Sequence, residues 1–112
     1  MLLREKQALF VRLVSKLIEH TYSSGYEMTF GEAWRPPETA ALYAAQGKGI
    51  AGSLHTSRLA VDLNLFKDGK YLASTEAHRP LGEWWEAQHE LCRWGGRFGD
   101  GNHYALTHGG KR

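Results

Sequence analysis

The sequence lacks several features that mark large classes of protein. Its 112 residues include a single cysteine, Cys92, so no internal disulfide can form, and a small buried apolar residue is expected there. No run approaches the roughly 18 apolar residues of a membrane-spanning helix. The start, Met1-Leu2-Leu3 followed by Arg4, Glu5 and Lys6, does not fit a secretory signal peptide. We therefore expect no membrane span and a cytoplasmic location.

Strong charge of one sign is also missing. Fourteen Lys and Arg against twelve Asp and Glu give a net charge of +2, and no basic block interleaved with aromatic residues occurs. This balance predicts no nucleic-acid partner. The apolar share of 42% and the charged share of 23% are ordinary for a folded domain, which excludes a disordered or fibrous chain. The length suits one small domain, 1–112.

Apolar periodicity and turn residues predict the secondary structure. Two segments have strong helical spacing of apolar residues, and the segment 59–66 has the clearest strand alternation. Asp68-Gly69 after this strand predicts a hairpin. The predicted elements are helix 2–22, strand 26–34, a helix from about 37 closed by 47–49, loop 47–58, strand 59–66, return strand 71–73, helix 80–93 closed by Gly95-Gly96, strand 104–106 and a polar tail 107–112. Together they predict an α+β fold with a small, mainly antiparallel sheet and helices packed against it.

Two histidines and one aspartate provide a candidate metal site. His55 falls in the predicted loop, Asp62 lies on the strand face opposite Val61 and Leu63, and His103 precedes the last strand. Two imidazoles and one carboxylate are the ligand count of a catalytic zinc site, which keeps its fourth position open. Spacing alone also allows a plain buried ion pair between His55 and Asp62.

A zinc hydrolase needs a further carboxylate close to the attacking water. Asp100 is the candidate, because the flanking Gly99 and Gly101 allow a turn that aims Asp100 and His103 at one point. His78 and His89 have no partner at metal-ligand spacing and are expected to be structural or exposed. His20, near the end of the first helix, is expected to be a surface residue that complements the helix dipole, and His108 in the polar tail is a disfavoured ligand. Arg35 lies at a strand-to-helix junction, where a surface ion pair is the alternative to a role in a cleft.

Two fragments of the sequence resemble a known family. Ser53-Leu54-His55 with Ala60-Val61-Asp62, and Trp94-Gly95-Gly96-Arg97-Phe98 with Asp100 and His103, resemble the zinc D-alanyl-D-alanine carboxypeptidase/dipeptidase family, and most of all its phage L-alanyl-D-glutamate endolysins. The likeness spans roughly residues 30 to 106. It implies a hedgehog/DD-peptidase-like fold, zinc held by His55, Asp62 and His103, and Asp100 as catalytic base. It also implies that Arg35 contacts the substrate or the developing oxyanion and that Ser53 supports the site through hydrogen bonds.

The resemblance sets functional expectations. It implies a monomeric zinc peptidase that cuts peptidoglycan stem peptides between L-Ala and D-Glu and waits in the host bacterial cytoplasm until a holin releases it. The alternatives are a carboxypeptidase that removes terminal D-Ala and a non-catalytic, zinc-containing cell-wall-binding module. The chain departs from many relatives at Arg58, where they have glycine, and at Thr39, where they have glutamine. These departures leave the substrate preference open.

Overall fold

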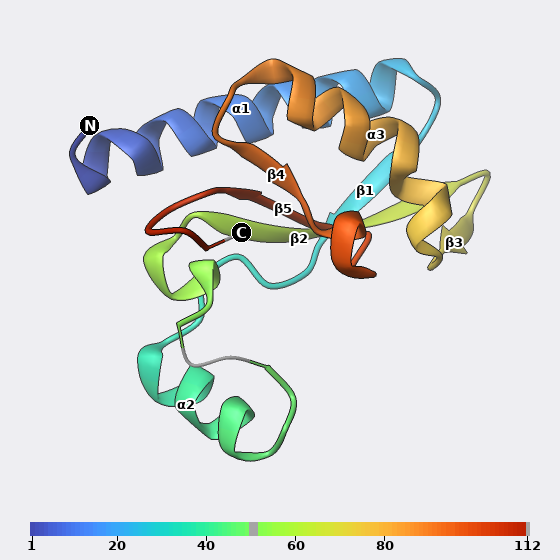
Figure 1. Cartoon of the computed structure of the whole chain (residues 1–112). Coiled ribbons are helices and arrows are strands. Elements are labelled where there is room, and N and C mark those ends of the chain that lie inside the picture. The colour runs from blue at the N-terminus through green and yellow to red at the C-terminus, as the bar shows by residue number, and fades with distance from the viewer. Residues whose placement is uncertain (50–51, 112) are drawn as a thin grey trace.

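The computed structural model describes residues 1–49 and 52–111. Over these residues the chain forms three α-helices and five β-strands (Figure 1). In chain order the elements are α1 (Leu3–Ser23), β1 (Glu27–Phe30), α2 (Pro37–Ala45), a 3₁₀ turn (Leu54–Ser57), β2 (Ala60–Lys67), β3 (Lys70–Leu72), α3 (Thr75–Gln88), β4 (Cys92–Trp94), a second 3₁₀ turn (Gly95–Phe98) and β5 (His103–Leu106).

The strands form one antiparallel sheet with the order β1-β2-β5-β4, and β3 also pairs with β2. β2 is the central strand. Its register places Met28 of β1 opposite Leu65 and places Asp62 opposite His103 of β5. The predicted α+β fold with a small antiparallel sheet is therefore confirmed.

Helices α1 and α3 cover one face of the sheet (Figure 1). The predicted alternation of β2 is confirmed there, since Val61, Leu63 and Leu65 are all buried in the core. Trp85 of α3 is fully buried, and its ring packs edge-on against Phe10 of α1 at 5.9 Å and against Tyr104 of β5 at 6.0 Å. Burying one large aromatic side chain between both helices and the sheet stabilises the layered arrangement.

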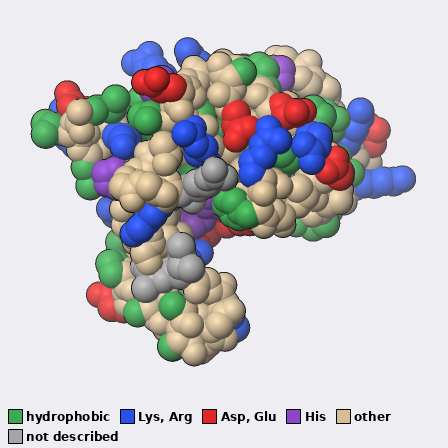
Figure 2. All heavy atoms as spheres, in the orientation of Figure 1, with side chains coloured by type: hydrophobic (Ala, Val, Ile, Leu, Met, Phe, Trp, Pro, Cys, Tyr) green, Lys and Arg blue, Asp and Glu red, His purple; other side chains and the backbone are tan. Residues whose placement is uncertain are grey.

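Within residues 1–49 and 52–111, no helix packs along the opposite face of the sheet. Helix α2 projects away from the sheet, and Figure 2 shows it as a lobe that stands out from the main body. Ala40 is the buried residue of this short helix. Polar side chains of β2, such as Asp62 and Asn64, lie on this second face and are half-buried. The fold therefore leaves room for a site on the side of the sheet that the core does not use.

Several local predictions hold. Helix 2–22 corresponds to α1, and the helix predicted from Pro37 corresponds to α2. The hairpin after β2 turns through Asp68 and Gly69, whose φ angles of 52° and 76° are the left-handed conformations that this dipeptide favours. The strand predicted over 26–34 is shorter, Glu27–Phe30. The predicted loop 47–58 ends in a 3₁₀ turn, and its residues 50 and 51 lie outside the described part of the chain.

The helix predicted over 80–93 is wrong at both ends. Helix α3 begins at Thr75, where the Ser74 hydroxyl accepts a hydrogen bond from the Ala77 N–H at 3.1 Å, and Pro80 lies inside the helix. It ends at Gln88, because Cys92–Trp94 forms β4 and pairs with β5. Gly95-Gly96 consequently does not end a helix; it begins the second 3₁₀ turn.

The lone cysteine matches its expectation. Cys92 is 1% exposed, and burial raises the pKa of its thiol to about 12, so it stays a neutral apolar group. Among the described residues, none of the helices combines the length and apolar character needed to cross a bilayer.

Candidate metal centre

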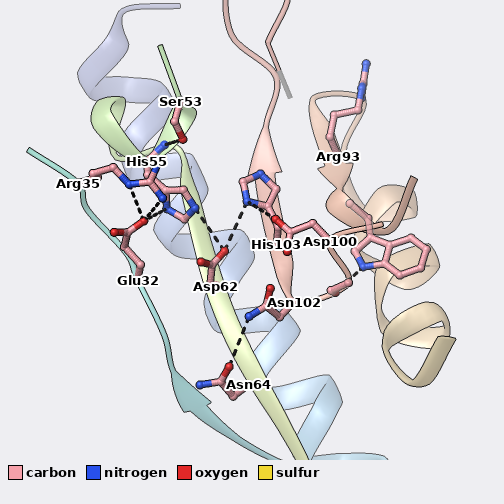
Figure 3. A network of polar contacts seen from close by, with 12 residues as sticks. Glu32, Arg35, Ser53, His55, Asp62, Asn64, Arg93, Asp100, Asn102 and His103 are labelled. Carbon is pink, nitrogen blue, oxygen red and sulfur yellow. Dashed lines mark hydrogen bonds and ion pairs between the residues drawn. The ribbon is translucent and has the colours of Figure 1, made fainter. Parts of the chain in front are cut away.

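Three side chains from three segments converge on the open face of the sheet (Figure 3). His55 comes from the first 3₁₀ turn, Asp62 from the middle of the sheet and His103 from the first position of β5. His55 Nε2 lies 3.3 Å from Asp62 Oδ1, and His103 Nδ1 lies 3.5 Å from the same oxygen. One donor atom of each residue lies within 4.8 Å of the other two. The structure thus brings together the three residues that the sequence suggested as ligands.

The local sequence explains why His55 faces this point. Ser53 caps the 3₁₀ turn, since its hydroxyl accepts a hydrogen bond from the His55 N–H at 3.3 Å and its carbonyl accepts one from the Thr56 N–H at 3.0 Å. Leu54 is buried in the core, which anchors the turn and directs His55 to the other side. Ser53 therefore holds the backbone of a candidate ligand.

The turn ends at Arg58, whose φ of 57° is left-handed. Glycine adopts this conformation without strain, which explains physically why a glycine suits the position. Here the Arg58 guanidinium lies over the Trp34 ring, 4.3 Å from its centre, and this contact helps to offset the strain. Arg58 thus belongs to the scaffold of the turn that carries His55.

The donor set fits a tetrahedral cation. Zn–N and Zn–O bonds of about 2.0–2.1 Å place neighbouring ligand atoms about 3.3–3.4 Å apart, close to the two distances around Asp62 Oδ1. That oxygen is buried and makes no hydrogen bond within the described chain, and the same is true of His55 Nδ1 and His103 Nε2. A buried polar atom without a partner is costly, and a cation between the three side chains would satisfy Asp62.

Electrostatics keep Asp62 ionised. Burial is the largest single influence and opposes its charge, but the close polar contacts and charge interactions with His103 and His55 together outweigh it and hold the pKa of Asp62 at about 2. A carboxylate that stays deprotonated between two imidazoles is the state that a divalent metal requires.

Asp100 lies beside the cluster without belonging to it. Its Oδ2 atom is 3.9 Å from His103 Nδ1, and its side chain is half-exposed. Partial burial raises the pKa of the Asp100 carboxyl, and the negative charge of Asp62 adds to this against the lowering effect of the imidazoles. A half-exposed carboxylate with a raised pKa next to a metal-ligand set has the properties of a proton acceptor.

The loop that carries Asp100 is tightly held. The Asp100 N–H donates to the Gly95 carbonyl at 2.9 Å, and the Trp94 indole N–H donates to the Gly101 carbonyl at 2.7 Å. The Trp94 ring packs between Gly82 and Gly96, where a Cβ atom at either position would overlap the indole. Trp94 therefore positions the Asp100 loop, a role that the sequence analysis did not assign to it although it lies in the resembling fragment. Its signal was the run of glycines that follows it.

Arg35 forms an ion pair at the edge of the site. Its Nε atom donates to Glu32 Oε1 at 2.8 Å, and its Nη2 atom donates to the same oxygen. The Arg35 side chain is 14% exposed and its guanidinium lies 5.3 Å from the centre of the Tyr43 ring. Glu32 was missed in the sequence because it fell inside the predicted strand 26–34, whereas the chain leaves the strand at Phe30 and turns Glu32 toward the site.

The remaining histidines lie away from the cluster. His78 is buried with Nδ1 3.1 Å from the Tyr104 hydroxyl, and His89 Nδ1 accepts a hydrogen bond from the Leu91 N–H at 3.0 Å. His20 stacks on Trp84, with 4.2 Å between ring centres. Among the described residues, no second group of three His, Cys, Asp or Glu side chains meets at metal-binding distance.

A separate apolar groove of about 430 Å³ lies between α1 and the segment that follows β1. Phe10, Val14, Phe30 and Trp34 are among its lining residues, and none of the three candidate ligands belongs to them. The candidate metal centre is therefore an open polar site on the sheet face and does not lie in this groove.

The fold and the cluster together define an α+β domain with three converging side chains, His55, Asp62 and His103, that could hold a metal ion on the open face of its sheet. No protein-family model and no curated protein sequence matches the chain. Among solved structures, it resembles the crystal structure of Serratia marcescens L-Ala D-Glu endopeptidase ChiX, with a TM-score of 0.74 and 18% sequence identity over 88% of this chain and 77% of that one. At this identity, the likeness establishes a shared fold.

Proposed function

We propose that the chain is a zinc-dependent peptidoglycan peptidase that hydrolyses an amide bond of the stem peptide. The observation that carries the proposal is the convergence of His55, Asp62 and His103, with Asp100 beside them. Fold likeness to an L-Ala D-Glu endopeptidase supports the choice of the L-Ala–D-Glu bond. When bound, zinc supplies Lewis-acid activation of water and of the scissile carbonyl.

The protein's own groups have separate tasks in this proposal. His55, Asp62 and His103 hold the cation, and Ser53 fixes the backbone of His55. Asp100 accepts a proton from the attacking water and passes it to the leaving amine. Arg35 offers planar N–H donors to a carbonyl or carboxylate oxygen of the substrate.

The biological setting is also a proposal. The resemblance of the fragments around His55 and His103 favours a phage or prophage endolysin, and we propose that it acts as a monomer. Such an enzyme stays in the host cytoplasm until a holin gives it access to the cell wall. The stem peptide is then its partner.

The test is digestion of purified peptidoglycan with the zinc-loaded protein, with a chelator-treated control and mass spectrometry of the products. New D-Glu amino termini that appear only without chelator support the proposal. Free D-alanine would instead identify a carboxypeptidase. Zinc-dependent wall binding without any released peptide, on walls of several chemotypes, would reject the peptidase and favour a binding module.

A further inference from the structure

Glu32 lies between the candidate ligand His55 and the candidate substrate-binding residue Arg35 (Figure 3). Its Oε1 atom accepts the hydrogen bonds from Nε and Nη2 of Arg35. The same oxygen lies 3.9 Å from His55 Nδ1. One carboxylate oxygen therefore faces both residues.

The backbone around Glu32 is tied to the metal centre. The Asp62 N–H donates to the Glu32 carbonyl, and the Gly31 N–H donates to the Asp62 carbonyl, both at 2.8 Å. The Arg35 N–H donates to the His55 carbonyl at 3.2 Å. These bonds fix the backbone of segment 31–35 against two of the candidate ligands, so the fold sets the point from which the Glu32 side chain reaches the site.

His55 needs a partner for its second ring nitrogen. Nε2 faces Asp62, and an imidazole that binds a metal through Nε2 carries its proton on Nδ1. Nδ1 is buried and has no hydrogen-bond acceptor among the described residues. A small shift of either side chain would bring Nδ1 and Glu32 Oε1 from 3.9 Å to a hydrogen-bonding distance of about 2.7–3.2 Å.

We propose that Glu32 is a positioning residue that orients both a metal ligand and the substrate-binding arginine. Toward the metal, it fixes His55 as the tautomer that is protonated on Nδ1 and presents Nε2 to the cation. Toward the substrate, it holds the guanidinium plane of Arg35. The second task rests on the proposed peptidase function, whereas the first requires only that the protein binds a metal.

The metal part is tested with Glu32→Gln, using Glu27→Gln as the matched control because Glu27 is an exposed residue of β1. Zinc affinity is measured by competition with a chromophoric chelator, and the absorption spectrum of the Co²⁺-loaded protein reports ligand geometry. We expect Glu32→Gln to weaken zinc binding about 10- to 100-fold and to change the Co²⁺ spectrum. Glu27→Gln should do neither. Wild-type affinity and spectrum in Glu32→Gln would overturn the proposal.

A measurement on the wild-type protein covers the case in which Glu32→Gln does not fold. Long-range ¹H–¹⁵N correlation spectra of the zinc-loaded protein identify which ring nitrogen of His55 carries the proton. The proposal requires the proton on Nδ1. A proton on Nε2, with Nδ1 bound to zinc, would overturn it.

The substrate part is tested by measuring the kinetics of Glu32→Gln, of Arg35→Lys and of the double variant that combines the two changes. Each single change is expected to raise KM, and the double variant should raise it by less than the product of the two, because both act through one guanidinium. Arg35→Lys should leave zinc affinity unchanged. If the two changes multiply in their effect on KM, Glu32 does not act through Arg35, and the substrate part of the proposal is overturned.

The outcomes also distinguish this proposal from the proposed function. If the zinc and tautomer results hold but no peptide is cleaved, the peptidase function fails while the orientation of His55 by Glu32 stands. A wild-type protein that binds no zinc would overturn both.

Discussion

Asp62 and His103 lie directly opposite each other on β2 and β5, and their Oδ1 and Nδ1 atoms are 3.5 Å apart. Two of the three candidate ligands are therefore held by the hydrogen-bonded register of adjacent strands and do not depend on a loop. Only His55 reaches the site from a turn, and that turn is capped by Ser53 and anchored by the buried Leu54. The fold alone therefore largely orders the three side chains, without a bound metal ion.

Zinc should stabilise the folded protein, and Asp62→Asn should abolish the effect. A ligand at about 100 times its Kd stabilises the folded state by about 2.7 kcal/mol, which raises Tm by about 10 °C or more in a domain of this size. The amide of Asn keeps the shape of Asp62 but removes the charge that attracts the cation. Thermal unfolding with zinc and with chelator measures the shift. An equal zinc-induced shift in Asp62→Asn would remove Asp62 from the ligand set.

The rise in Tm that zinc causes should disappear at acidic pH. Imidazole binds a metal only in its neutral form, so zinc affinity is expected to fall as the pH drops below about 6. Asp62 does not cause this loss, because its pKa of about 2 keeps it ionised throughout that range. Zinc affinity at pH 4 equal to that at pH 7 would contradict the assignment of His55 and His103.

Asp100→Asn should separate chemistry from metal binding. General acid–base catalysis contributes about 10²- to 10⁴-fold, so turnover is expected to fall by that factor. Zinc affinity and Tm should stay near wild type, because Asp100 lies 3.9 Å from His103 Nδ1 and outside the donor set. Asp68→Asn, in the exposed hairpin, is the matched control and should retain full activity. Normal peptide hydrolysis by Asp100→Asn would require a different proton acceptor.

The buried His78 should make stability depend on pH. Burial lowers the pKa of His78 from 6.5, and a hydrogen bond with the Leu72 backbone only partly opposes this. Below pH 6.5 the unfolded chain therefore binds more protons at this residue than the folded chain does. The free energy of unfolding decreases as the pH is lowered, until His78 is protonated in the folded state as well. Well above pH 6.5, where His78 is neutral in both the folded and the unfolded chain, the residue adds no pH dependence.

Urea denaturation in the presence of chelator, from pH 8 to pH 5, checks this expectation. His78→Gln should be less stable at pH 7, because it loses the packing and the contact with Tyr104. It should also lose less stability between pH 6.5 and pH 5 than the wild type does. Parallel curves for the two proteins would assign the acid sensitivity to other groups.

Local sequence signals were sufficient where one segment determined its own structure. The alternation of Val61, Leu63 and Leu65, the Asp68-Gly69 turn and the periodicity of α1 each predicted the structure that is found. The candidate ligands were also identifiable, because the strand face of Asp62 follows from this alternation.

Contacts between segments that are distant in the sequence determined the elements and the site residue that the sequence did not predict. Cys92–Trp94 has enough apolar character for the end of a helix, but it pairs with β5 and becomes a strand. The Ser74 cap set the start of α3 in place of Pro80. The role of Glu32 depends on where the chain leaves β1 and on the approach of His55 from a distant turn. Single-segment patterns contain no information about such contacts.

We expect Gly95 to be essential for placing both the candidate ligand His103 and the candidate base Asp100. A Cβ atom at this position would overlap the Asp100 carbonyl and the His103 Cβ, and the Gly95 carbonyl also accepts a hydrogen bond from the Asp100 N–H at 2.9 Å. We expect Gly95→Ala to lower the free energy of unfolding by about 1–3 kcal/mol, the usual cost of overpacking, and also to weaken zinc binding and turnover. Gly99→Ala is the matched control, since a Cβ there meets open space and adds only the strain of a left-handed φ of 82°. It is expected to cost about 1–2 kcal/mol and to leave zinc affinity unchanged. If both variants retain wild-type zinc affinity, close packing at Gly95 does not position His103.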